Sequence, residues 1–135
     1  MSDPKRELVR SWLAKAQRDL ASARALAAAD PPLLDTAVYH CQQAAEKAIK
    51  AFLVFCDCEF GRVHDLEALV IAAAPFAAAF WDWADAARRL TPYVRIYRYP
   101  GYADEPTPPE FGEALEDAEG IFAFVLSLLP EDMHP

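Results

Sequence analysis

The chain has 135 residues, 54% of them apolar, and a formal net charge of −8. This length suits one domain with one hydrophobic core, and this composition excludes a disordered chain. No apolar run reaches the ~18 residues expected of a membrane span, and the first residues, MSDPKRELVRSW, contain no signal-peptide core. We therefore expect a cytoplasmic protein without membrane contact. The negative charge argues against a protein that coats DNA.

Neither the cysteines nor the glycines suggest a cofactor site. The three cysteines, Cys41, Cys56 and Cys58, make a poor disulfide framework, and Cys56-x-Cys58 lacks the spacing of a zinc site. No two histidines stand at helical metal spacing, and the four glycines are not clustered into a phosphate-binding loop. We expect no bound metal and no cofactor.

The first predicted helix covers residues 4–29. Asp3 can cap its start, and Pro4 suits the first helical position. The Asp30-Pro31-Pro32 run ends it, because a residue before proline leaves the helical region, and so short a connection makes the next helix an antiparallel neighbour. Its apolar seam has steps of four and three, typical of a helix packed lengthwise against others: Val9, Leu13, Ala16, Leu20, Ala23 and Ala27.

The second predicted helix, residues 35–57, is the stretch around which the chain is organised. It contains no Gly or Pro and is rich in residues that favour helices. Asp35 or Thr36 can cap its start. Its apolar seam is small in the middle, so that another backbone can approach closely there: Val38, Cys41, Ala45, Ala48, Phe52 and Phe55.

The other side of this helix is polar. Gln42 and Glu46 form one row, and a second row with steps of three, four and three consists of His40, Gln43, Lys47 and Lys50. One interpretation is a solvated or helix-bridging face, in which the histidine is structural. The other is a polar groove that holds an anion, where the lysines suit phosphate as point charges.

Two helices are predicted between residues 64 and 97. His64-Asp65 begins a short one, which Pro75 interrupts. A longer helix over residues 76–97 is kinked or restarted at Pro92, because a proline inside a helix removes a backbone hydrogen bond. The seam that predicts it has steps of four and three: Phe76, Phe80, Trp83, Ala87, Leu90 and Val94.

The last predicted helix covers residues 109–129, after a proline-rich loop over residues 99–109. Its apolar seam again has steps of four and three: Phe111, Leu115, Ala118, Phe122, Val125 and Leu129. No segment alternates with period two, so we expect no strand. The four long seams predict an all-α protein, an up-and-down four-helix bundle with one short extra helix. We expect a single helical domain over residues 1–130 and a short, mobile tail over residues 131–135.

Charge is unevenly distributed along the sequence. Residues 103–135 contain nine acids and no Lys or Arg, whereas residues 88–98 contain four arginines and no acid. These arginines are either solvated or form a basic patch on an acidic body. Arg95 and Arg98 are the strongest candidates for binding an anion, because a guanidinium reaches phosphate bidentately and stacks on bases. Tyrosines that either hold a base or cover the helix end lie among them: Tyr93, Tyr97, Tyr99 and Tyr102.

Three motifs resemble those of the HEPN family, whose name refers to higher eukaryotes and prokaryotes and to nucleotide binding. Residues 37–53, AVYHCQQAAEKAIKAFL, resemble its signature helix. HDLEAL at residues 64–69 resembles its His-x-Leu-x-x-Leu helix start, and Tyr93 with RYP at residues 98–100 resembles its Tyr plus Arg-Tyr-Pro element. The resemblance covers residues 12–129.

The resemblance implies the helical bundle and, often, a homodimer. It also implies a non-catalytic nucleotide- or substrate-binding protein that partners a separate minimal nucleotidyltransferase, in a toxin–antitoxin-like pair. The crowded aromatics Phe80, Trp81 and Trp83 independently favour a homodimer, because one small bundle does not hide them fully.

The candidate residues fall into two groups. We expect nucleotide or anion binding, with a nucleotide or a short RNA as ligand, at His40, Gln43, Lys47, Lys50, Arg95, Arg98 and Tyr99. We expect a structural motif at Gln42, Glu46 and His64.

RNases of the family carry an Arg, four to six residues and then a His. No histidine of this chain has an Arg at that spacing, and Arg62 precedes His64 with one residue between. We therefore predict no catalytic residue. Two alternatives stay open: an RNA-cleaving toxin that uses an unrecognised arrangement of Arg95 and Arg98 with His40 or His64, and a dimeric scaffold that binds no ligand.

Overall fold

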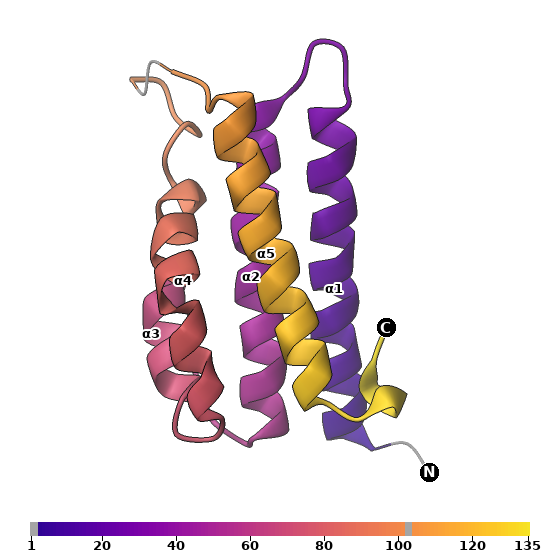
Figure 1. Cartoon of the computed structure of the whole chain (residues 1–135). Helices are drawn as coiled ribbons and strands as arrows, with labels where there is room; N and C mark the ends of the chain where they lie inside the picture. Colours follow the sequence, from indigo (N-terminus) through magenta and orange to yellow (C-terminus); the bar gives the residue numbers. More distant parts are fainter. Residues whose placement is uncertain (1–2, 102–103) are drawn as a thin grey trace.

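The computed structural model describes residues 3–101 and 104–135, which form helices and loops without a strand. Figure 1 shows that successive long helical segments run alternately up and down, with a short helix beside the third of them. The predicted all-α bundle with one extra helix is therefore confirmed. Its helices are α1 (Pro4–Ala27), α2 (Leu34–Phe55), the short α3 (Leu66–Ala73), α4 (Ala84–Leu90) and α5 (Pro108–Leu128).

Helix α2 is the centre of the bundle. Fourteen of its 22 residues are buried, and it packs against α1, α3, α4 and α5. It begins one residue before the predicted start, and its N-cap residue Leu33 makes no side-chain cap hydrogen bond. The predicted caps Asp35 and Thr36 were therefore wrong: both lie inside the first turn, where the Asp35 carboxylate accepts a hydrogen bond from the Thr36 N–H.

Helix α1 packs lengthwise against α2, as the short connection between them predicts. The Asp3 carboxylate accepts a hydrogen bond from the Lys5 N–H, so the predicted N-cap is confirmed. Both helices contribute small side chains to the core, and Ala16, Ala23, Ala45 and Ala48 are all fully buried. Small residues at this contact allow the two backbones to lie close together.

We expect Ala45→Leu to lower the free energy of unfolding by about 1–3 kcal/mol, because three extra carbon atoms must enter a fully packed contact. Ala25→Leu is the matched control, since Ala25 is exposed on α1 and leucine is a good helix former. Denaturant unfolding compares the two. Equal stabilities would mean that Ala45 does not face the core.

The helix predicted over residues 76–97 is interrupted at Pro92, as expected, but its α-helical part is shorter than predicted and covers only Ala84–Leu90. A 3₁₀ helix, η1 (Ala78–Trp83), precedes α4, and a second one, η2 (Thr91–Val94), follows it. Pro92 ends the α-helix at Leu90 because it has no N–H to donate. The Thr91 hydroxyl donates to the Ala87 carbonyl at 2.8 Å and accepts from the Leu66 N–H at 3.0 Å, which ties α4 to the start of α3.

Helix α5 closes the bundle. Thr107 and Glu110 form a capping box at its start, one residue before the predicted position. At Gly120 the missing side chain makes room for Trp83, since a Cβ built there would lie 2.6 Å from two atoms of the Trp83 ring. Gly120 thus lets the ring of Trp83 lie directly on the helix.

Residues 131–135 pack on the bundle. Glu131–Met133 form a 3₁₀ turn, η3, in which Met133 is 5% exposed. Asp132 pairs with Arg6 at 2.6 Å, and the ring Nε2 of His134 lies 2.9 Å from the Leu126 carbonyl oxygen. Within the described residues, no helix combines the length and the apolar character needed to cross a membrane.

Candidate functional site

A buried polar network lies at the middle of α2. Glu46 is 3% exposed, and its carboxylate accepts hydrogen bonds from Lys50 Nζ and Gln42 Nε2, both at 3.1 Å. The same carboxylate lies 2.9 Å from His64 Nδ1, and Gln42 also donates to the His64 carbonyl oxygen at 3.1 Å. Gln43 Nε2 donates to Gln42 Oε1 at 2.7 Å. These bonds tie α2 to the loop that precedes α3.

Lys50 is enclosed rather than open to a ligand. The residue is 5% exposed, and its Nζ lies 5.8 Å from the ring centroid of Trp12 and 5.3 Å from that of Phe60. The two aromatic rings and the Glu46 carboxylate replace water around the ammonium group. Lys50 is therefore not part of the candidate binding site.

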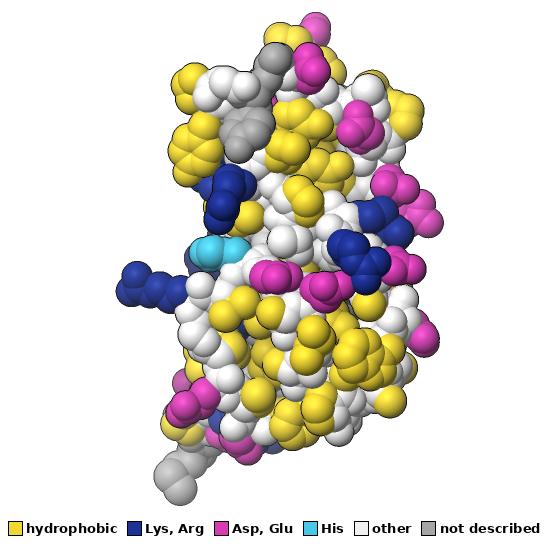
Figure 2. Space-filling model, turned by 90° about the vertical axis from the view of Figure 1, so that its left-hand side faces the viewer, with side chains coloured by type: hydrophobic (Ala, Val, Ile, Leu, Met, Phe, Trp, Pro, Cys, Tyr) yellow, Lys and Arg dark blue, Asp and Glu magenta, His cyan; other side chains and the backbone are white. Residues whose placement is uncertain are grey.

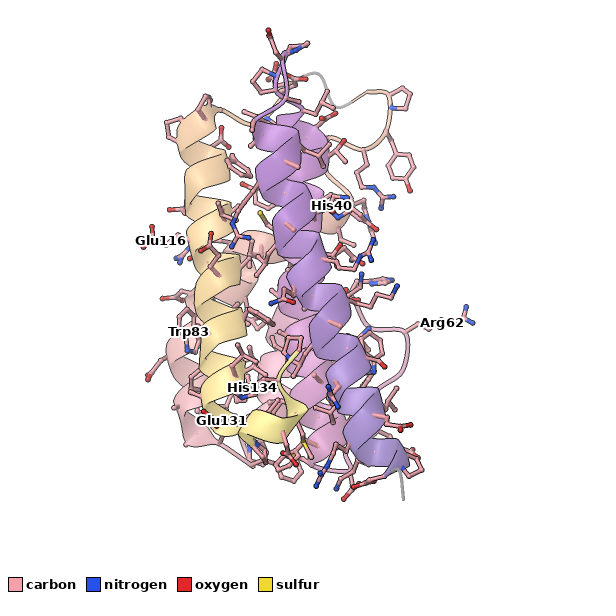
Figure 3. The ribbon with its side chains drawn as sticks, turned by 90° about the vertical axis from the view of Figure 1, so that its right-hand side faces the viewer. His40, Arg62, Trp83, Glu116, Glu131 and His134 are labelled. Atoms are coloured by element: carbon pink, nitrogen blue, oxygen red, sulfur yellow. The ribbon has the colours of Figure 1, made fainter. Side chains whose placement is uncertain are left out.

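Asp19 of α1 holds two more of the predicted residues. It is 7% exposed, and its two carboxylate oxygens lie 2.7 Å from His40 Nδ1 and 2.6 Å from Lys47 Nζ. The charge of Lys47 is thus neutralised within the protein, whereas His40 keeps its Nε2 available. In Figure 3, His40 lies on the side of α1 away from α5. The sequence offered one signal for Asp19, its position beside Leu20 in the apolar seam.

An open hollow of about 570 Å³ lies between α2 and the chain after η2. Its lining residues, which we call the groove, are Tyr39, Gln43, His64, Val94, Arg95, Arg98 and Tyr99. The structure thus brings together four predicted binding residues, Gln43, Arg95, Arg98 and Tyr99. Figure 2 shows a histidine and Lys or Arg side chains gathered at the left edge of the molecule.

Arg98 is held against aromatic rings in the groove. Its Cζ lies 4.0 Å from the ring centroid of Tyr39 and 5.7 Å from that of Tyr99, and its Nη1 donates to the Val94 carbonyl oxygen at 2.9 Å. The preceding residue, Tyr97, has a φ of 70°, in the left-handed region that non-glycine residues rarely adopt. Such strain costs about 1–3 kcal/mol and is concentrated at functional sites.

A second, smaller hollow adjoins the groove. It has a volume of about 230 Å³ and is lined by Asp35, Thr36, Tyr39, His40, Tyr97 and Arg98. Tyr39 and Arg98 line both hollows, so their stacked side chains form the wall between them. His40 belongs to this second hollow and reaches the groove only past that wall. Tyr39 was not singled out from the sequence, although it stands four residues before Gln43 on α2.

The expected basic patch is smaller than four arginines. Arg88 pairs with Glu67 and with Asp85, each at 2.8 Å, and Arg89 pairs with Asp117 at 2.9 Å. The hydrogen bond to Glu67 is the main cause that raises the pKa of Arg88, and the one to Asp117 does so for Arg89. The interpretation that includes Arg88 and Arg89 in the patch was therefore wrong, because both face acids of neighbouring helices.

The remaining two arginines have no such partner among the described residues. Within residues 3–101 and 104–135, neither Arg95 nor Arg98 forms an ion pair, and both are exposed. Arg62, which projects into solvent in Figure 3, also forms none there. Tyr102 lies outside the described residues. In the part of the chain that the structure describes, no three metal-ligating side chains come together.

These features define a helical bundle with a cationic, aromatic groove beside its central helix. The model of the HEPN domain family matches residues 9–128, and the chain therefore belongs to the HEPN family. A comparison with curated proteins gave no match.

Two solved structures are similar to this chain. One is the crystal structure of TT1696 from Thermus thermophilus, with a TM-score of 0.78 and 28% identity over 90% of this chain and 98% of that one. The other is ST0689, described as an archaeal HEPN homologue, with a TM-score of 0.67 and 27% identity over 89% of this chain and 96% of that one.

Proposed function

We propose that the protein is a non-catalytic binding module whose groove holds a phosphate-bearing ligand, a nucleotide or a short RNA. The observation that carries this proposal is the pair Arg95 and Arg98, exposed in one hollow and without a carboxylate partner among the described residues. In a chain of net charge −8, most other cations on the bundle are neutralised by acids. Two unneutralised guanidinium groups at one hollow are suited to bind phosphate.

The aromatic side chains supply the second half of the proposed recognition. Tyr99 is 56% exposed at the groove, and Tyr39 presents its ring to Arg98. A base can stack on either ring or on the guanidinium plane, and such stacking tolerates any base. Gln43 lies in the same lining and can donate or accept a hydrogen bond at a base edge. The strained Tyr97 backbone fits a segment shaped for binding.

Family membership supports the wider role that the sequence motifs imply. We propose that a separate minimal nucleotidyltransferase is the partner protein and that the two form a toxin–antitoxin-like pair in the cytoplasm. The homodimer implied by the resemblance belongs to the same proposal. A small nucleotidyltransferase in the neighbouring reading frame would support this role, and we expect the groove to bind a substrate of that enzyme.

Arg95→Ala combined with Arg98→Ala is expected to abolish ligand binding. Each charge-assisted contact contributes about 1.5–3 kcal/mol to the binding free energy. The loss of two such contacts should therefore weaken a ligand of modest affinity until the titration no longer detects its binding. Calorimetric titration with ATP and with a short single-stranded RNA measures this. The matched control is Arg10→Ala combined with Arg88→Ala, which changes the net charge equally at two exposed residues outside the groove.

The two variants separate a specific site from general attraction of anions. If the control weakens binding as much as the groove variant does, the groove is not the site. If neither ATP nor the RNA gives a binding signal, with the folded protein alone or mixed with the partner nucleotidyltransferase, the proposal of a bound ligand is refuted and the dimeric scaffold remains.

One observation favours RNA cleavage as a second candidate function. The Nδ1 atom of His40 lies at the buried carboxylate of Asp19, and the Nδ1 atom of His64 lies at that of Glu46. Both arrangements leave the Nε2 atom available to act as an acid or a base. The two rings lie in adjoining hollows with Arg98 on the shared wall. Metal-free cleavage of RNA in EDTA that is lost in His40→Ala and in His64→Ala would establish this function in place of the first.

A further inference from the structure

The ring of His64 lies between a buried carboxylate and the groove. Its Nδ1 lies 2.9 Å from Glu46, which is 3% exposed, whereas 57% of the His64 side chain is exposed. The ring lines the groove together with Arg95 and Arg98. Among the described residues, no group forms a hydrogen bond with its Nε2. The nitrogen on the far side of the ring from Glu46 is therefore available to a ligand in the groove.

The carboxylate behind His64 already has its charge balanced. Lys50 Nζ lies 3.1 Å from Oε2 of Glu46, while His64 Nδ1 contacts the other oxygen, Oε1. The pair of Glu46 and Lys50 is therefore neutral overall and still presents an acceptor to the ring. Such an acceptor fixes the orientation of an imidazole and favours a proton on Nδ1. Glu46 is thus a positioning residue, which holds the ring with Nε2 away from α2.

The other charges that face the ring are cationic or already engaged. Asp65, the next residue, uses its carboxylate to cap the start of α3. Arg62, in the same loop, forms no ion pair among the described residues, and neither do Arg95 and Arg98 across the groove. No carboxylate belongs to the described lining of the groove. The negative charge that would balance an imidazolium on this side must therefore come from a ligand.

We propose that the groove binds a terminal phosphate group, and that His64 joins Arg95 and Arg98 as its third cation by taking up a proton. The inference rests on the proposed function, because it concerns the same groove. A terminal phosphate carries a charge of about −1.5 to −2 near neutral pH and offers three acceptor oxygens. A phosphate inside an RNA strand carries only one negative charge. Three cations at one hollow match the terminal group, which a mononucleotide and a phosphorylated RNA end share.

Proton uptake gives the site a pH dependence of known sign. Histidine is the side chain that ordinarily changes its charge near neutral pH. A ligand that binds the imidazolium more tightly than the neutral ring draws a proton onto it, and by linkage the protein binds that ligand more tightly as the pH falls. A terminal phosphate itself takes up a proton at about pH 6. Affinities are therefore compared above that range, where we expect tighter binding at about pH 7 than at about pH 8.5.

Calorimetric titration with AMP and with cyclic AMP tests the inference, because the two ligands share base and sugar but only AMP has a terminal phosphate. At about pH 7 we expect AMP to bind about tenfold more tightly than cyclic AMP, the effect of one charge-assisted contact. In buffers of different ionisation enthalpy, AMP should bind with net proton uptake and cyclic AMP without it. A short RNA with and without a terminal phosphate is the second ligand pair. A preference in this pair without binding of AMP identifies the RNA end as the source of the phosphate.

His64→Asn removes the proposed cation and keeps a side-chain N–H near the place of Nδ1. We expect this variant to bind AMP about tenfold more weakly at about pH 7, without proton uptake, and to differ less from wild type at about pH 8.5. The matched control is His134→Asn, since that ring lies against the carbonyl oxygens of Leu126 and Leu129, outside the groove. It should keep both the affinity and the proton uptake.

Circular dichroism checks that each variant is folded. Should His64→Asn fail to fold, NMR of the wild-type ring gives the same answer. Its signals should change to those of the imidazolium form when AMP is added at about pH 7.

Three results would overturn the inference: equal affinity with and without the terminal phosphate in both ligand pairs, binding of the terminal phosphate without proton uptake, or uptake that survives in His64→Asn and is lost in His40→Asn. Each of them leaves the proposed function in place, because a phosphate-bearing ligand would still bind through Arg95 and Arg98. If none of these ligands binds, the proposed function and this inference are refuted together.

Discussion

Glu46→Gln is expected to lower the free energy of unfolding by about 3–5 kcal/mol, because it leaves Lys50 as a buried charge without its partner. Glu46 and Lys50 are 3% and 5% exposed, and water can reach neither readily. In the wild type, the Glu46 carboxylate stabilises the Lys50 ammonium at 3.1 Å. In the variant, only the rings of Trp12 and Phe60 remain to stabilise that ammonium. The substitution also removes the anionic acceptor that His64 Nδ1 contacts. Urea or guanidinium unfolding measures the loss.

Two further variants isolate the buried charge as the cause. Glu46→Leu combined with Lys50→Met removes both charges and should recover most of the lost stability, since apolar residues replace buried ion pairs well. Asp57→Asn breaks the exposed pair with Lys5 at 3.2 Å and should cost about 0–1 kcal/mol. A Glu46→Gln variant no less stable than Asp57→Asn would show that Lys50 reaches water.

Gly120→Ala is expected to lower the free energy of unfolding by about 3 kcal/mol, the upper end of the range for overpacking. The new Cβ would lie 2.6 Å from Cη2 and Cζ3 of the Trp83 ring. That ring is rigid and packs beside Phe124, whose own ring contacts Phe80. Moving it therefore disturbs the aromatic cluster between η1 and α5. Thermal or denaturant unfolding measures the change.

Gly112→Ala is the control on the same helix and should have the opposite sign. A Cβ at Gly112 meets nothing within 4 Å. Replacing glycine by alanine inside a helix stabilises by about 0.5–1 kcal/mol. If Gly120→Ala stabilises the protein as Gly112→Ala does, Trp83 does not rest on α5 in solution.

The long helices could be predicted from the sequence because their signals are local. The predicted start of α1 coincides with the observed one, and the predicted ends of α1, α2 and α5 lie within two residues of the observed ones. Each follows from apolar spacing together with a cap, proline or glycine nearby in the chain. The seam over residues 76–97 misled for the same reason. Its spacing correctly placed Phe80, Ala87 and Leu90 in the core, but residues 78–83 form a 3₁₀ helix in which Phe80 contacts Phe52 and Phe124, and Phe76 before it is 53% exposed.

The candidate site could be predicted only in part, because its assembly is tertiary. Helical spacing correctly groups His40, Gln43, Lys47 and Lys50 on one side of α2 but does not say what covers that side. Asp19 and Trp12 of α1 do so, and they neutralise or enclose the two lysines. Arg95 and Arg98 could be chosen as candidate anion-binding residues from the local composition alone, since residues 88–98 contain no acid. Their position opposite Tyr39 depends on how η2 packs on α2.

Binding of a phosphate-bearing ligand in the groove is tested most directly by NMR titration of labelled wild-type protein with ATP and with a short single-stranded RNA. We predict saturable shifts of the backbone amides of residues 39–43 and 94–99, with smaller or no shifts along the acidic helix α5. The same titration of Arg95→Ala combined with Arg98→Ala should leave the spectrum unchanged. Saturable shifts confined to other residues, or no shifts with either ligand, would contradict the assignment of the groove.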